Sequence, residues 1–291
     1  HVYQEVYKVR QGGEKMSGVF NYINKKSPIH ALTGASKLIV LILWSLAAMT
    51  TFDTRLLIVL PIFSLILFKI SGIKYKDVSF VINFTLVFMV LNNVLIFLFS
   101  PEHGVSIYGT RHVIWNGIGR WVVTKEQLFY QLNVILKYIA TIPIVILFVS
   151  TTDPSEFASS LNRVGVSYKI AYSVSLALRY IPDIQREYHE ISVAQQARGL
   201  ELNKEKEGLF KRLKCAATLL FPLIVSSMER IEVIANAMEL RGFGKNKKRT
   251  WYSSRPFRKG DYIAIIASVA IMVISMVLNI VNGGRYYNPF I

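Results

Sequence analysis

Five uninterrupted apolar stretches are the feature that most constrains how this chain can fold. Each is long enough, or nearly so, to cross the roughly 30 Å hydrocarbon core of a bilayer as a helix. They lie at residues 36–52, 56–70, 78–100, 128–150 and 262–283. Hydrophobic residues make up 52% of the sequence and the net charge is +16, so apolar and charged residues are segregated along the chain. We predict an all-α membrane protein with about five transmembrane helices.

The lysines and arginines in the loops predict the orientation of these spans. Basic residues precede the first span, follow the second, and are dense between the fourth and the fifth. We expect all three regions on the cytoplasmic side. The N-terminus is then cytoplasmic and, after five spans, the C-terminus is outside.

The sequence divides into four parts. Residues 1–15 lack the apolar core of a signal peptide and are read as an upstream extension or a vector remnant. The other three are residues 16–150 with four spans and an outer loop at 101–127, residues 151–260 as cytoplasmic and interfacial helices, and residues 261–291 as the last span and tail. The outer loop alternates apolar and polar residues around "WNGIG", which predicts a small hairpin.

Residues 151–260 predict one short helix followed by two long ones. In "TTDPSEF", Asp153 is a good N-cap and Pro154 suits the first helical position. We expect long helices over about 167–198 and about 208–241. The apolar first half of the second one is too short to span a bilayer, so it is expected to lie in the membrane interface or among other helices.

The two long helices form a loose repeat. Each carries a proline in its middle, Pro182 in the first and Pro222 in the second. Since a proline deletes one backbone hydrogen bond, we expect a hinge at each of these positions. A fixed bend that turns the chain at the membrane interface is the alternative.

Both long helices end in an arginine followed by a glycine, as Ala197-Arg198-Gly199 and Leu240-Arg241-Gly242. A cation in the last turn and a glycine cap would alone explain either end. A cation and a cap do not explain why the pattern occurs twice. Nor do they explain the length of helix between each proline and its arginine, which is about 25 Å at about 1.5 Å per residue. A slim tip with one always-charged, multi-donor side chain can enter a groove and bind a carboxylate or backbone carbonyls. We predict that these six residues dock onto a partner.

The sequence carries no pattern that predicts catalysis. It has no GxxxxGK[ST] phosphate loop, no HExxH pair and no Ser-His-Asp or paired-carboxylate arrangement, and its one cysteine is Cys215. We predict no catalytic residue, no metal site and no cofactor bound by this chain, which is not expected to be an enzyme. Energy for any transport would have to enter from another chain.

Two segments carry a family resemblance. The run "TTDPSEFASSLNRVGVSYKIAYSVSLALRYIPDIQREYHEISVAQQARG", followed by "RIEVIANAMELRGFG", resembles the transmembrane T component of energy-coupling factor (ECF) transporters, a family that includes the cobalt-transport permease. The similarity covers the layout of residues 36–281 and is most specific over 151–244. The early segment "SPIHALTGASKL" is also similar.

The resemblance implies an import complex of four parts in a bacterial or archaeal cell membrane. These are this scaffold, two ABC-type ATPase subunits that are identical or different, and one substrate-binding S component. Arg198 and Arg241 would each end a coupling helix and dock into one ATPase, while ATP and magnesium stay on the ATPases. The S component would choose the substrate, which the resemblance limits to a vitamin, a vitamin precursor or a transition-metal ion.

The main alternative is a self-contained secondary transporter or another multispanning permease. Such a protein needs polar groups within its spans. The candidates are Asn83, Asn92, Asn93, Asn133 and Lys137. Hydrogen bonds between helices are the simpler explanation of the asparagines. A membrane enzyme is a third, weaker alternative.

The basic segment 245–259 mixes cations with aromatic residues just before the last span. That position predicts attraction to anionic membrane lipids and not to nucleic acid.

Overall fold

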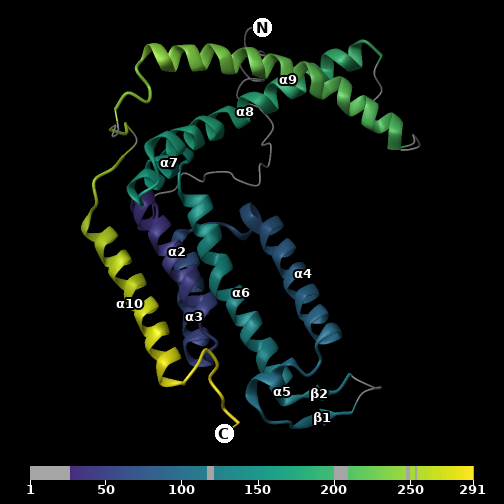
Figure 1. Ribbon diagram of the computed structural model, residues 1–291, viewed down its shortest axis with the longest axis vertical. Coiled ribbons are helices and arrows are strands. Elements are labelled where there is room, and N and C mark those ends of the chain that lie inside the picture. The colour runs from purple at the N-terminus through teal and green to yellow at the C-terminus, as the bar shows by residue number, and fades with distance from the viewer. Residues whose placement is uncertain (1–26, 117–120, 200–208, 247–249, 253, 291) are drawn as a thin grey trace. The chain divides into compact units, whose positions relative to one another are not determined.

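The computed structural model describes residues 27–116, 121–199, 209–246, 250–252 and 254–290. They form helices α2 to α10 and a two-stranded β-ribbon (Figure 1). The chain divides into two compact units, the first from His1–Asp153 and Pro256–Ile291 and the second from Pro154–Arg255. The expected extension at 1–15 lies outside the described residues.

The first unit contains the apolar helices, and the expected all-α membrane protein is confirmed. Its elements are α2 (Gly34–Thr50), α3 (Thr54–Ser71), α4 (Tyr75–Phe99), α5 (His103–Tyr108), β1 (Val113–Trp115), β2 (Val123–Thr124), α6 (Lys125–Thr151) and α10 (Lys259–Val281). By length and composition, α3, α4, α6 and α10 can cross a membrane. The remaining apolar stretch, at residues 36–52, forms α2, whose 17 residues are at the lower end of the range for a spanning helix.

Helix α6 is at the centre of the first unit. It packs against α2, α3 and α4, and α10 packs against α2. The core includes Trp44, Leu60, Ala140 and Ile144. Trp44 also donates its indole N–H to the Ala140 carbonyl at 3.0 Å.

A proline inside α6 leaves a backbone carbonyl without its usual donor. Pro143 has no N–H, so the carbonyl of Ile139, four residues earlier, loses its hydrogen bond within the helix. Ser64 on α3 donates its hydroxyl to that carbonyl at 3.2 Å. A neighbouring helix therefore satisfies the freed group, as the apolar interior of a bilayer requires.

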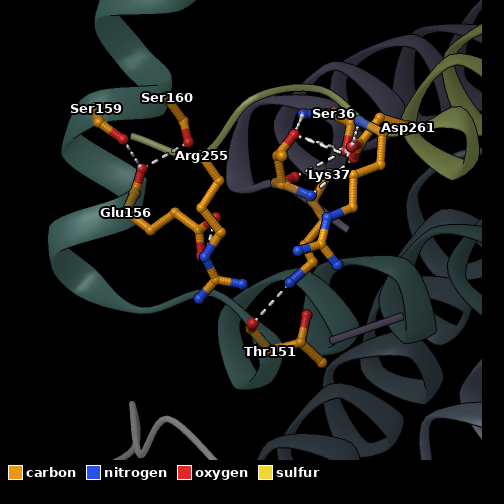
Figure 2. Close-up of polar contacts among 10 residues, drawn as sticks. Ser36, Lys37, Thr151, Glu156, Ser159, Ser160, Arg255 and Asp261 are labelled. Carbon is orange, nitrogen blue, oxygen red and sulfur yellow. Dashed lines mark hydrogen bonds and ion pairs between the residues drawn. The ribbon is translucent and has the colours of Figure 1, made fainter. Parts of the chain in front are cut away.

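One buried carboxylate joins the first turns of α2 and α10. Asp261 is fully buried and accepts hydrogen bonds from the Thr33 amide at 2.7 Å, the Ser36 hydroxyl at 2.5 Å and the Arg258 amide at 2.7 Å (Figure 2). The Thr33 hydroxyl donates to it as well, at 3.1 Å. The negative charge lies beside the positive ends of two helix dipoles.

Polar residues recur along α10 at a spacing of seven. They are Asp261, Ser268 and Ser275 in the helix and Asn282 directly after its end. Ser268 and Ser275 are buried. Ser275 donates to the Ala47 carbonyl on α2 at 3.3 Å, and since Asp261 meets the start of α2, the two helices run parallel. Small residues at this contact let the two backbones approach closely.

Two buried lysines lie against the C-terminal ends of neighbouring helices. Lys37 on α2 donates to the carbonyl of Thr151, the last residue of α6, at 2.8 Å (Figure 2). Lys137 on α6 donates to the Met49 carbonyl in the last turn of α2 at 3.0 Å. Each ammonium group therefore complements the negative end of a helix dipole.

The loop at 101–127 contains the expected hairpin and a short helix that was not predicted. Strands β1 and β2 pair antiparallel, and the residues between them at 117–120 lie outside the described residues. In α5, a side chain at Gly104 would collide with the backbone of Glu126. Burial raises the pKa of the Tyr108 hydroxyl in the same helix to about 12.

The second unit contains α7 (Pro154–Arg163), α8 (Tyr168–Ala197) and α9 (Leu209–Leu240). Helix α7 begins at Pro154, as predicted. Glu156 in its first turn pairs with Arg255 at 3.7 Å, and the backbone carbonyl of Glu156 accepts hydrogen bonds from Ser159 and Ser160 (Figure 2). These contacts tie the end of the unit back to its first helix.

We predict that Asp261→Asn lowers the free energy of unfolding by about 1.5–3 kcal/mol, because the amide presents a donor where Thr33 and Ser36 also donate. The matched control is Asp77→Asn, an exposed carboxylate in the first turn of α4. Unfolding in mixed detergent micelles measures both. Equal losses in the two variants would contradict the role given to Asp261.

We also expect Ser268→Leu to cost about 1–3 kcal/mol of stability, since the larger side chain would be forced between α2 and α10. Val269→Leu, at a neighbouring position that is 44% exposed, should change stability by less than about 0.5 kcal/mol. Melting temperatures of the purified variants test this difference. A Ser268→Leu protein as stable as the parent would show that the contact has room for a large side chain.

Candidate functional site: the arginine-glycine ends of two crossed helices

The end of α8 has the cap that its sequence predicts. Arg198 is the C-cap residue, and its amide donates to the Ala194 and Gln195 carbonyls at 3.3 and 3.1 Å. Gly199 follows with a φ of 89°, a left-handed conformation that favours glycine. Its amide donates to the Gln196 carbonyl at 2.9 Å.

The end of α9 repeats this geometry. The amide of Gly242 donates to the Glu239 carbonyl at 2.8 Å, and that of Phe243 donates to the Met238 carbonyl at 2.9 Å. These are the two hydrogen bonds of a Schellman cap, with Arg241 at the C-cap and Gly242 at a φ of 66°. Both predicted glycine caps are therefore confirmed.

The side chains at both ends face solvent in the isolated chain. Ala197 and Arg198 are exposed on α8, and Arg241 is exposed after α9. Leu240, next to Arg241, is 90% exposed. The two ends thus combine positive charge with exposed apolar surface.

Both long helices continue through their prolines. Pro182 lies inside α8 and Pro222 lies inside α9, and each helix is one continuous element. Neither proline has an N–H to donate to the carbonyl four residues before it, that of Leu178 or Thr218. Hinges at these two prolines remain a prediction.

Helices α8 and α9 cross each other at a polar contact that was not predicted from sequence (Figure 1). Glu187 on α8 accepts a hydrogen bond from the Arg230 guanidinium on α9 at 2.6 Å and another from the Ser226 hydroxyl. The Arg230 guanidinium also lies 6.0 Å from the centre of the Tyr180 ring. Opposite charges on the two repeated helices were the available signal for this contact.

An apolar groove of about 550 Å³ runs between α8 and α9. Leu176, Ala177 and Tyr180 line it from α8, and Ile231, Ile234, Ala235 and Met238 line it from α9. Glu239, which follows Met238 directly, also lines the groove.

Four of the polar residues that a self-contained transporter would use, Asn83, Asn93, Asn133 and Lys137, each have at least one hydrogen-bond partner within the protein. Asn133 accepts from the Thr54 hydroxyl on α3 at 2.8 Å, and Asn83 accepts from the Tyr75 hydroxyl at 2.8 Å. Asn93 donates to the Met89 carbonyl at 2.9 Å within α4. Lys137, described above, lies against the end of α2. These contacts join or stabilise helices and do not gather into one site.

Within the described part of the chain, no group of three or more histidine, cysteine, aspartate or glutamate side chains could hold a metal ion. Cys215 is partly buried. In the basic segment 245–259, Trp251 donates to Asn162 on α7 at 3.1 Å, and residues 247–249 and 253 lie outside the described residues.

Comparison with known proteins identifies the family. A family model described as cobalt transport protein, CbiQ, matches residues 25–252. The Staphylococcus aureus energy-coupling factor transporter transmembrane protein EcfT is 27% identical over 266 residues, which cover 88% of this chain and 95% of that protein. The protein of the same name from Streptococcus thermophilus is 28% identical over 269 residues, covering 87% and 95%.

The protein of that name from Limosilactobacillus fermentum is 30% identical over 177 residues, which cover 58% of this chain and 65% of that protein, just under two thirds. The family model covers most of the chain, including both arginine-glycine ends and the two crossed helices. The chain therefore belongs to the CbiQ cobalt transport protein family, as a transmembrane T component of the ECF transporter type.

Proposed function

We propose that this chain couples ATP hydrolysis by two partner ATPase subunits to the movement of a substrate-binding S component. The complex would import a vitamin, a vitamin precursor or a transition-metal ion. Arg198 would dock onto one ATPase and Arg241 onto the other. ATP and magnesium would bind to the ATPases, and this chain would be a scaffold without catalytic groups of its own.

The paired geometry of the helix ends is the observation that carries this proposal. Arg198 and Arg241 occupy the same C-cap position, and each is followed by a glycine in the left-handed conformation. That glycine turns the chain away directly after the arginine, so the arginine forms the end of a narrow helical tip. Two equivalent tips match a partner that presents two equivalent grooves.

The surface around the tips suits burial against a protein. A guanidinium offers five N–H donors in a planar fork, which can bind a carboxylate with two parallel hydrogen bonds. Leu240, 90% exposed beside Arg241, and Ala197, exposed beside Arg198, add apolar surface that would leave water on docking. Arginine at the centre of a desolvated contact is typical of binding hot spots.

The exposed apolar face of α9 supports contact with a second membrane protein. On α9, Phe221, Ile224, Met228 and Ile231 are each more than half exposed and recur at helical spacing. Exposed apolar patches of this kind mark interaction surfaces. We propose that the S component packs on this face and receives the motion of the tips through the two helices.

We expect the double variant Arg198→Ala and Arg241→Ala to lose its ATPase subunits, since each tip loses its charge and its donors. Co-purification measures this when the tagged chain is expressed with the ATPase and S-component genes of the same organism. Import of radiolabelled cobalt and of a panel of radiolabelled B vitamins should fall by about tenfold or more, the effect of losing a few charge-assisted hydrogen bonds.

The matched control is Arg186→Ala, which removes an exposed arginine from the same helix and a surface ion pair with Asp183. It should keep both ATPases and full import. Retention of both ATPase subunits by the double variant would overturn the docking role.

Hinges at Pro182 and Pro222 would affect how much substrate is imported per ATP hydrolysed. Pro182→Ala with Pro222→Ala restores two backbone donors, so both helices should stiffen and the protein should melt at a higher temperature. We expect ATP hydrolysis to continue while import per ATP falls. Unchanged import per ATP would favour fixed bends over hinges.

A further inference from the structure

The Glu187–Arg230 ion pair is the main polar contact across the crossing of α8 and α9. Its side chains are 17% and 35% exposed, so it is partly shielded from water and salt. Glu187 also accepts a hydrogen bond from Ser226, one turn before Arg230 on the same helix. Three side chains thus fix two helices at one point.

This ion pair lies at the same distance along the chain from both arginine tips. Eleven residues lead from Glu187 to Arg198, and eleven lead from Arg230 to Arg241. The prolines do not show this symmetry, since Pro182 and Pro222 lie 16 and 19 residues before the same arginines. The number of residues between the ion-pair residue and the terminal arginine is therefore the same in the two long helices.

Equal spacing along a helix means equal length and equal rotation. Eleven residues span about 16 Å and about three full turns. Each tip arginine therefore lies on about the same side of its helix as the ion-pair residue. The two arms that leave the crossing match in reach and in the direction of their arginines.

We propose that Glu187 and Arg230 are positioning residues that set the angle at which α8 and α9 cross, and so the separation of Arg198 and Arg241. Because the arms are equal, a change of angle at this point moves both tips by the same amount. This inference rests on the proposed docking of the tips. It adds the residues that hold them at the right separation.

Neighbouring contacts do not replace the ion pair. The pocket lining along α8 and α9 is mostly apolar, and because the hydrophobic effect is non-directional, apolar contacts alone do not specify one crossing angle. On α8 itself, the adjacent pair Arg186–Asp183 has side chains that are 74% and 38% exposed and joins residues of one helix only. This pair also joins an arginine to a carboxylate, and it lies next to Glu187 in the sequence. Because both of its residues belong to α8, it cannot hold the two helices together, and it is a suitable control.

The first experiment measures the crossing directly. Cysteines replace the exposed residues Ala194 and Asn236 in a Cys215→Ser background and carry spin labels, in the full-length chain purified with its partner subunits. We expect Glu187→Arg and Arg230→Glu, which each place like charges together, to shift or broaden the distance distribution. The swap of both residues should restore it. Asp183→Asn with Arg186→Gln should leave it unchanged.

The second experiment measures import per ATP hydrolysed, in vesicles and with whichever radiolabelled ion or vitamin the parent complex accumulates. Each single charge reversal should lower this ratio by about fivefold or more, the usual lower bound of a coupling between sites. The swap should recover most of it. A structural defect alone would lower the amount of assembled complex, whereas a positioning defect lowers the ratio at equal assembly.

The outcomes separate the two proposals. Single reversals with the distance distribution of the parent would overturn the positioning role. A changed distribution at full import per ATP would overturn it as well, since the crossing would then not matter for coupling. Retention of the ATPases by the Arg198 and Arg241 double variant would remove the proposed function and leave the distance result in place.

Discussion

Every helix that ends in or near a bilayer must find partners for its last backbone groups, and this constraint organises the described structure. In the first unit the partners are buried charges of the sign that each helix dipole favours. Asp261 lies at the first turns of α2 and α10, and Lys37 and Lys137 lie at the last turns of α6 and α2. Burial of these charges is tolerable because each has at least one hydrogen-bond partner at the helix end that it faces.

In the second unit, backbone groups and not buried charges satisfy the ends of α8 and α9. Arg198 and Arg241 close their helices with backbone hydrogen bonds and a glycine, so the caps need no side chain. Both arginine side chains are exposed at these helix ends. In a T component of the ECF type, exposed cations at two matched helix ends are the natural place for contact with the ATPases that we propose as partners.

Sequence patterns predicted the elements well and their contacts poorly. Long apolar runs located the spanning helices, and proline or glycine marked where α7 begins and where α8 and α9 end. Thr33, which donates to Asp261, lies 228 residues away, and no periodicity indicates which helix α10 would meet. The prolines of the repeat do not indicate the Glu187–Arg230 contact, because they lie at unequal distances from the two arginines. Helix α5 has six residues, too few for a periodic signal.

The account depends most on the claim that the two arginine-glycine tips contact ATPase subunits. A photo-crosslinking amino acid at Ala197 or Leu240, in the intact complex in membranes, tests that contact without changing either arginine. We predict crosslinks from both positions to the ATPase subunits, and none from the exposed residue Val269 on α10. Crosslinks from Ala197 and Leu240 only to lipid or to the S component would contradict the account.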